Sequence, residues 1–188
     1  MYEERFMKEA IKEAEIAMSQ NEVPVGAVIV KDGVIIGRGH NLKEQRKLCT
    51  AHAEIVAIED ASSTLGQWYL DGCEMYVTME PCAMCAGALI NSRIEHLYYG
   101  TPDLRFGACG TLYNLPVDER FNHRLTVEGG LMREECLALL QTFFRALRKS
   151  GGRKKKEQCA CGQADHACAH DHATEAQTDG CTNEHKEN

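Results

Sequence analysis

Two short segments of this sequence carry residue types that bind a catalytic metal ion. One contains His52 and Glu54, and the other, which follows Pro81, contains Cys82 and Cys85. Cys82 and Cys85 are three residues apart, so on a helix they lie on the same face. The first turn of a helix has unpaired N–H groups and a favourable dipole, which stabilise thiolates, the form of cysteine that binds zinc.

One histidine and two cysteines would give a zinc ion three protein ligands. The fourth tetrahedral position would then be open to water, whose pKa zinc lowers to about 7. We expect Glu54 to carry protons beside this water rather than to bind zinc, because a fourth protein ligand would close the open position. The alternative is a structural zinc site, in which Cys49, Cys73 or Cys109 supplies the fourth ligand.

The predicted secondary structure places these residues at the starts of two helices. Apolar residues at helical spacing indicate helices, β-branched and apolar runs indicate strands, and Asp32-Gly33 is typical of a tight hairpin turn. Strand–helix–strand units in the second half favour parallel strands. We therefore predict an α/β fold, a three-layer α/β/α sandwich around a mixed five-stranded sheet. The predicted helices are 4–19, 52–65, 81–93 and 133–149, and the predicted strands are 23–30, 34–39, 74–78, 94–99 and 125–128.

Local signals predict where the helices begin and end. Thr50 is a candidate N-cap for helix 52–65, Gly66 ends that helix, and Pro81 suits the first position of the next one. The residues before Thr50 are predicted to form a polar loop. In the last helix, an apolar stripe is expected to face the core, and it contains Cys136, Leu139, Leu140, Phe143 and Leu147.

Length and composition exclude two broad classes of protein. The chain has 188 residues and a formal net charge of −7, and its longest uncharged, largely apolar stretch, Pro81 to Ile90, is too short to span a membrane. The start of the sequence is charged and shows no secretory signal. We therefore expect a cytoplasmic protein with no membrane association. In such a protein, clustered cysteines are more typical of metal binding or catalysis than of disulfides.

Residues 151–188 differ from the rest of the chain. No Val, Ile, Leu, Met, Phe, Trp or Tyr occurs beyond Leu147, so this segment cannot bury enough apolar area to offset the entropy of ordering it. We predict a folded domain over residues 1–150 and a disordered tail that is first basic and then rich in Cys and His. The C-x-C, C-x-H and H-x-H spacings of the tail could chelate metal, but none is a zinc-finger spacing. We favour adventitious or buffering metal affinity over a specific second site.

The two metal-binding segments together match a known signature. His52-Ala53-Glu54 and Pro81-Cys82-Ala83-Met84-Cys85 form the H-x-E…P-C-x-x-C pattern of zinc nucleobase deaminases. On this pattern and its flanking segments, the chain from about residue 2 to 149 resembles the cytidine/nucleoside deaminase superfamily and, within it, the tRNA-specific adenosine deaminases. The flanking segments are 21–30, 50–55, 77–90, 92–94, 107–110, 122–124, 135–136 and 143–145.

The resemblance implies a cytidine deaminase-like fold and a zinc-dependent hydrolase with one Zn²⁺ per subunit. His52, Cys82 and Cys85 would hold the zinc ion, and Glu54 would be the catalytic proton shuttle. The implied reaction is the deamination of adenosine to inosine at the wobble position of a tRNA anticodon loop. Water activated by zinc would attack C6 of adenine while Glu54 protonates N1 and then helps ammonia to leave. The family also implies a homodimer.

The same resemblance implies a set of contacts with tRNA. Asn41 aligns with the residue that hydrogen-bonds the flipped base, although an asparagine that caps a loop is the alternative. Seven Lys and Arg and no acid occur between Arg145 and Lys156, which suits either a phosphate footprint or cations at a helix C-terminus with a solubilising run. Taken alone, His123 is more typical of an ordinary surface histidine than of an RNA contact. The implied RNA contacts are Ala53, Asp103, Arg105, Asn122, His123, Arg145 and Arg148.

Two other functions compete with this interpretation. A free-base or nucleotide deaminase of the guanine or cytosine type would share the metal site, although guanine deaminases typically carry bulky aromatic residues where this chain has Ala88-Leu-Ile-Asn91. A non-enzymatic zinc-binding module with a basic tail would have four protein ligands. Four departures from the family pattern, at Leu48-Cys49, Asn91, Arg105 and Phe106, leave the chemistry intact and bear on tRNA specificity.

Overall fold

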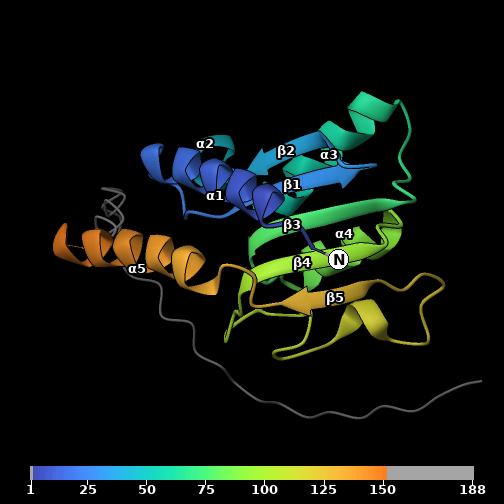
Figure 1. The fold of residues 1–188 in the computed structure, drawn as a ribbon. Coiled ribbons are helices and arrows are strands. Elements are labelled where there is room, and N and C mark those ends of the chain that lie inside the picture. The colour runs from blue at the N-terminus through green and yellow to red at the C-terminus, as the bar shows by residue number, and fades with distance from the viewer. Residues whose placement is uncertain (1, 152–188) are drawn as a thin grey trace, which may run out of the picture. The chain divides into compact units, whose positions relative to one another are not determined.

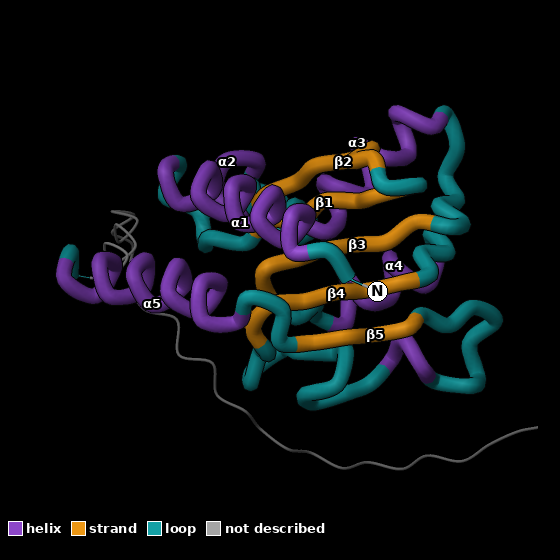
Figure 2. The backbone as a smooth tube through the Cα atoms, viewed as in Figure 1, coloured by secondary structure: helices purple, strands orange, loops and turns teal. Residues whose placement is uncertain are grey.

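The strands form one mixed five-stranded sheet in the order β2-β1-β3-β4-β5 (Figures 1 and 2). The computed structural model describes residues 2–151, so the predictions for residues 152–188 lie outside the described residues. The strands are β1 (Gly26–Lys31), β2 (Val34–His40), β3 (Cys73–Met79), β4 (His96–Thr101) and β5 (Thr126–Gly129). The helices are α1 (Glu4–Ser19), α2 (Lys43–Arg46), α3 (Ala53–Leu65), α4 (Ala83–Asn91) and α5 (Arg133–Lys149), with a 3₁₀ turn η1 (Leu115–Val117).

Strand β1 is the one strand of this sheet that runs opposite to both of its neighbours. Strand β1 runs antiparallel to both β2 and β3, whereas β3, β4 and β5 run parallel to one another. The β1–β2 hairpin turns at Asp32 and Gly33, whose φ angles of 50° and 75° lie in the left-handed region that a tight hairpin turn requires. The predicted mixed sheet is therefore confirmed.

Helices cover both faces of the sheet and complete the predicted three-layer sandwich. Helices α1 and α5 pack on one face, where Met7, Tyr76 and Tyr98 are buried together. Helices α3 and α4 pack on the other face, over Met75 and Leu97. None of the helices described in residues 2–151 is long and apolar enough to cross a membrane.

A glycine in β2 allows α3 to approach the sheet closely. A Cβ atom at Gly39 would lie 2.3 Å from the backbone oxygen of Ala53 and 2.4 Å from the backbone nitrogen of Ala57. No side chain fits in that space, so only glycine at this position lets the first turn of α3 rest against β2. The start of α3 is therefore fixed in depth against the sheet, and this turn carries the predicted catalytic residues.

Two helix starts and one loop differ from the sequence predictions. The N-cap of α3 is His52 rather than Thr50, and α4 begins at Ala83 with Cys82 as its N-cap, so Pro81 lies before the helix. The predicted polar loop before Thr50 contains the short helix α2. In both helices the predicted metal ligand occupies the cap position, where the backbone is extended. The ligand therefore lies beside the first N–H groups of the helix, which have no partner within the helix.

The apolar stripe of α5 is only partly covered. Cys136 and Leu140 are buried, whereas Leu147 is 37% exposed. The start of α5 packs on β4, and its later turns extend beyond the sheet (Figure 1). The predicted stripe is therefore correct near Cys136 and wrong as a core contact at Leu147, because the sheet ends before the helix does.

Candidate active site

Three predicted metal ligands meet where α3 and α4 begin. The Nδ1 atom of His52 lies 3.8 Å from the sulfur of Cys82 and 3.6 Å from the sulfur of Cys85. The three possible ligand atoms all lie within 4.8 Å of one another. One imidazole nitrogen and two sulfurs are a donor set that suits zinc. Among residues 2–151, this is the one group of three or more His, Cys, Asp or Glu side chains that could hold a metal ion.

The electrostatics of the three ligands favour a thiolate. The pKa of Cys82 is lowered to about 4, first by a hydrogen bond from the Cys85 thiol and then by one from His52. The pKa of Cys85 is raised because its thiol donates to Cys82, and the pKa of His52 is raised because its protonated ring donates to the same sulfur. The sulfur of Cys82 is therefore a thiolate that accepts hydrogen bonds from Cys85 and His52. Its negative charge would also attract a divalent cation.

Glu54 lies beside the ligands in the first turn of α3. Its side chain is 4% exposed, and burial raises the pKa of its carboxyl group above the usual range. Glu54 is not a member of the group of possible metal ligands. A buried carboxyl group with a raised pKa next to a metal site is suited to take up and release protons.

The four-ligand alternative is not supported by the positions of the other cysteines. Cys49 is exposed, Cys73 is buried at the start of β3, and Cys109 is buried with its thiol 3.8 Å from the backbone oxygen of Pro81. Within residues 2–151, none of the three joins the group of possible ligands. The described part of the chain therefore offers three ligands, which is the number found at catalytic zinc sites.

A cleft of about 1110 Å³ opens over the metal-binding group. It combines the catalytic residues with a rim that includes arginines of α5, and it is larger than a single nucleobase requires. Cys85 lies beneath its floor and is fully buried. The predicted site residues that line the cleft are Asn41, His52, Ala53, Glu54, Cys82, Asp103, Arg105, Arg145 and Arg148.

Asn122 and His123 do not line this cleft. The Nε2 atom of His123 lies 2.7 Å from the backbone oxygen of Ile94, which precedes β4. The cleft instead lies near the residues that follow the carboxyl ends of β3 and β4, including Glu80 and Asp103. Contact of Asn122 and His123 with tRNA therefore stays a prediction that is separate from the cleft.

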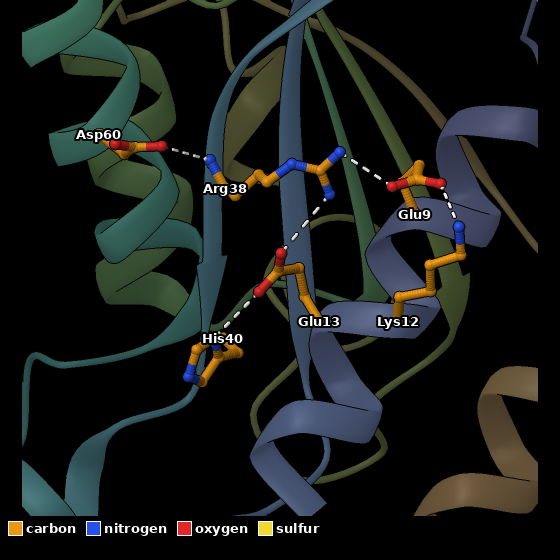
Figure 3. A network of polar contacts seen from close by, with 6 residues as sticks. All are labelled: Glu9, Lys12, Glu13, Arg38, His40 and Asp60. Carbon is orange, nitrogen blue, oxygen red and sulfur yellow. Dashed lines mark hydrogen bonds and ion pairs between the residues drawn. The ribbon is translucent and has the colours of Figure 1, made fainter.

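A polar network ties β2 to helices on both faces of the sheet (Figure 3). The backbone N–H of Arg38 donates to Asp60 of α3 at 2.8 Å, and its guanidinium contacts Glu9 of α1 at 2.9 Å. Glu13 of α1 lies 3.5 Å from the Arg38 guanidinium and 3.0 Å from Nδ1 of His40. Since β2 is an edge strand, these contacts hold it in place up to its last residue, His40.

Sequence reasoning missed the residue that holds Asn41. Glu22 is 1% exposed, and its carboxylate accepts hydrogen bonds from the Asn41 side-chain amide at 3.2 Å and from the Gln45 backbone at 2.8 Å. The Asn41 backbone N–H also donates to Val25 at 3.0 Å. Asn41 is thus fixed in its loop and also lines the cleft, and its hydrogen bond to a base stays a prediction.

A second buried carboxylate was also missed. Glu80 lies between the end of β3 and Pro81, and its side chain accepts hydrogen bonds from the segment after β4. A charged residue between a buried strand and a cysteine-bearing helix was the available signal, because a buried carboxylate needs donors nearby.

The chain is similar to known deaminases in both sequence and structure. A family model described as MafB19-like deaminase matches residues 1–148. The tRNA-specific adenosine deaminase of Bacillus subtilis (strain 168) is 51% identical over 147 residues, which cover 78% of this chain and 91% of that protein.

Two solved structures bear on the competing functions. One, from a study of A-to-I editing by tRNA:A34 deaminases at the wobble position of transfer RNA, has a TM-score of 0.70 and 41% identity and covers 72% of this chain and 99% of its own. A guanine deaminase from Bacillus subtilis has a TM-score of 0.51 and 40% identity and covers 54% of this chain and 66% of its own. The guanine deaminase therefore shares less of the fold.

Proposed function

Because this chain belongs to the deaminase family that contains the tRNA-specific adenosine deaminases, we propose that it converts adenosine to inosine at the wobble position of tRNA anticodon loops. The observation that carries this proposal is the group of His52, Cys82 and Cys85 beside the buried Glu54, in a cleft with arginines on its rim. An anticodon loop presents unstacked bases, so placing one of them in a cleft costs little.

The residues of the cleft divide the reaction between them. His52, Cys82 and Cys85 would hold one Zn²⁺ per subunit, and zinc bound there lowers the pKa of a water molecule to about 7. Glu54 takes a proton from the attacking water and delivers it to N1 of adenine. The water oxygen bonds to C6, and Glu54 then takes the remaining proton from this new hydroxyl and passes it to the exocyclic nitrogen. The bond from C6 to that nitrogen breaks and ammonia leaves, so that water and adenosine give inosine and ammonia.

Asn41 and Ala53 would position the base in this reaction. The Asn41 amide is anchored on Glu22 and lines the cleft, so it is placed to hydrogen-bond a base without first losing freedom of movement. Ala53 is 1% exposed and follows His52 directly, and its small side chain leaves room beside the ligands.

The direct test is an inosine assay on tRNA. Total tRNA is incubated with the protein and inosine at the wobble position is measured, with free guanine, cytosine and dCMP as parallel substrates. We expect inosine in tRNA and no turnover of the free compounds. Turnover of guanine with unmodified tRNA would support the guanine deaminase alternative, which the higher sequence identity to tRNA-specific adenosine deaminases disfavours.

We propose that the rim of the cleft binds the tRNA backbone. Arg145 and Arg148 are exposed, three residues apart on α5, and line the cleft together with Arg105. Asp103 lies on the same rim and would contact sugar hydroxyls near the target base. On a chain with a net charge of −7, such a local group of arginines gives phosphates a defined place to bind.

Replacing Arg145 with alanine is expected to weaken tRNA binding and to flatten its dependence on salt. Each lost contact with a single-stranded phosphate lowers the slope of log K against log salt concentration by about 0.7. Binding is measured by filter retention at several salt concentrations. The control is Arg133→Ala, which removes an exposed arginine from the other end of α5. An unchanged slope for Arg145→Ala would remove this residue from the RNA-binding surface.

We propose that the protein is a homodimer. Large exposed apolar side chains are concentrated after β4, with Leu104 79% and Phe106 68% exposed. Leu112, Tyr113 and Phe121, which also follow β4 in the chain, are 50%, 64% and 42% exposed. An apolar surface of this kind is typical of an interface, and a second copy of the chain is the partner that the family suggests.

We propose a cytoplasmic location. The six cysteines between residues 2 and 151 are free thiols, and two of them are the proposed zinc ligands. A reducing compartment keeps such thiols available to metal, since oxidation to disulfides would remove them.

We propose that residues 1–150 form the deaminase domain and hold the one specific zinc ion. Native mass spectrometry is expected to find one zinc per chain in both the full-length protein and a 1–150 truncation. A second zinc that is present only in the full-length chain would show that the Cys- and His-rich residues after 150 form a specific site.

A further inference from the structure

We propose that Glu80 is a positioning residue for the deamination of tRNA: its buried carboxylate fixes the segment from Asp103 to Thr111 at the edge of the cleft and thereby sets where Asp103 and Arg105 meet the substrate. This inference rests on the proposed function for its substrate. The arrangement of the segment around Glu80 does not depend on that function.

The carboxylate of Glu80 is surrounded by donors from one segment. Its Oε2 accepts the backbone N–H of Asp103 at 3.0 Å and the hydroxyl of Thr111. Its Oε1 accepts the backbone N–H groups of Cys109 and Thr111, both at 3.0 Å. The side chain is 3% exposed, and within residues 2–151 no Lys, Arg or His forms an ion pair with it.

These bonds use the acceptor capacity of Glu80. A carboxylate has about four lone-pair positions, and four donors occupy them. Although Glu80 borders the cleft, its oxygens are engaged by the protein itself and are not available to exchange protons with a substrate. Its role is therefore to hold other groups in place, which separates it from Glu54.

The backbone on both sides of Glu80 is also fixed. Its own N–H donates to the oxygen of Thr101, the last residue of β4, at 2.9 Å. The N–H of Ala108 donates to the oxygen of Pro81 at 2.9 Å, and Cys82 forms an isolated β-bridge with Gly107. The residue before the metal-binding turn and the segment after β4 are therefore held as one unit.

Gly107 shows how closely the segment surrounds the carboxylate. A Cβ atom at Gly107 would lie 2.4 Å from Oε2 of Glu80 and 2.6 Å from the backbone oxygen of Asp103. Such a distance leaves no room for a side chain, so glycine is required for the segment to close over Glu80. The glycine of this turn thus has a packing reason that the sequence pattern alone does not give.

The effect of Glu80 reaches the substrate through two residues of the rim. Glu80 holds the backbone of Asp103, and the Asp103 carboxylate in turn accepts the backbone N–H of Arg105 at 2.9 Å. Both Asp103 and Arg105 line the cleft. A displaced Asp103 would move the proposed sugar and phosphate contacts together. His52 and Glu54 lie at the start of α3, apart from this segment. Because Cys82 is bridged to Gly107 of the segment, the zinc content of any Glu80 variant is measured beside its kinetics.

The test is the variant Glu80→Gln, studied in the full chain with zinc bound. The new amide group keeps one acceptor oxygen but directs a donor at N–H groups that need an acceptor. We expect KM for tRNA to rise about tenfold and kcat to change less than about threefold, since substrate contacts are lost and the chemistry is retained. The matched control is Glu74→Gln in β3, the strand that ends directly before Glu80. In the described residues the Glu74 carboxylate accepts the Tyr76 hydroxyl at 3.0 Å, and wild-type kinetics are expected.

Hydrogen exchange provides a readout that needs no substrate. The backbone amides of Asp103, Cys109 and Thr111 are expected to be protected in the wild type and to exchange faster in Glu80→Gln. A double-mutant cycle with Asp103→Ala is expected to be non-additive, because the loss of Asp103 removes most of what Glu80 contributes. Additive losses would overturn the inference.

The outcomes separate this inference from the proposed function. If the wild type forms no inosine in tRNA, the proposed function fails. Unchanged amide protection in Glu80→Gln would, independently of that result, overturn the inference that Glu80 holds the segment from Asp103 to Thr111. A lower kcat with an unchanged KM would place Glu80 in the chemistry and also overturn it. If Glu80→Gln does not fold, Thr111→Val decides, because it removes one donor only: a smaller rise in KM supports the inference, and wild-type KM overturns it.

Discussion

Replacing Glu54 with alanine is expected to reduce the rate of inosine formation in tRNA by about 10²–10⁴-fold while one zinc ion per chain stays bound. Glu54 is the buried carboxyl group beside the metal-binding group, and its raised pKa suits it to exchange protons with water and base. It is not one of the three possible ligands, so its removal leaves the donor set intact. Single-turnover inosine formation and zinc content are the two measurements.

Two further variants make the interpretation of Glu54→Ala specific. Glu54→Gln keeps the size of the side chain but cannot carry the proton, so it is expected to lose activity to a similar degree. Glu59→Ala removes an exposed carboxylate from the same helix and is expected to retain full activity. Wild-type rates in Glu54→Ala would contradict the proton-shuttle role. Loss of activity together with loss of zinc would indicate that Glu54 is a ligand instead.

Replacing Cys85 with serine is expected to remove zinc and to destabilise the fold. Cys85 is fully buried beneath the cleft and supplies one of only three ligands in the described chain. A metal ion that binds only the folded state at 100 times its Kd stabilises that state by about 2.7 kcal/mol. For a domain of this size we therefore expect Tm to fall by about 5–10 °C.

The measurements for Cys85→Ser are zinc content and thermal unfolding with and without a chelator. Chelation should lower the Tm of the wild type toward that of the variant and leave the variant nearly unchanged. Cys73→Ser, at an equally buried free cysteine at the start of β3, should keep its zinc. A variant of Cys85 that retains a full complement of zinc would refute the three-ligand site.

Most of the metal site could be predicted because its determinants are local. Cys82 and Cys85 are separated by one helical turn, and Glu54 follows His52 by two residues, so short-range spacing and helix ends set their geometry. The bounds of α1 and α5 agree with the predictions for the same reason, since helical periodicity is read from neighbouring residues.

The helix starts were predicted one or two residues too early because caps depend on the surroundings. Thr50 and Pro81 have the right chemistry for helix starts, but the cap positions are occupied by His52 and Cys82. Close packing of α3 on Gly39 sets where that helix can begin. The sequence shows that a helix begins nearby, whereas contact with the sheet selects the residue.

The sequence by itself determined which side chains can bind a metal and carry a proton, and how the elements alternate. Only the tertiary structure decided what holds the substrate-facing segments. Glu22 lies 19 positions from Asn41 and accepts from its side-chain amide and from the backbone N–H of Gln45. Glu80 lies 31 positions from Thr111 and accepts mainly from backbone N–H groups. Every residue except proline has such a group, so no pattern of side chains marks the donor, and the partners are defined only when the sheet brings distant segments together.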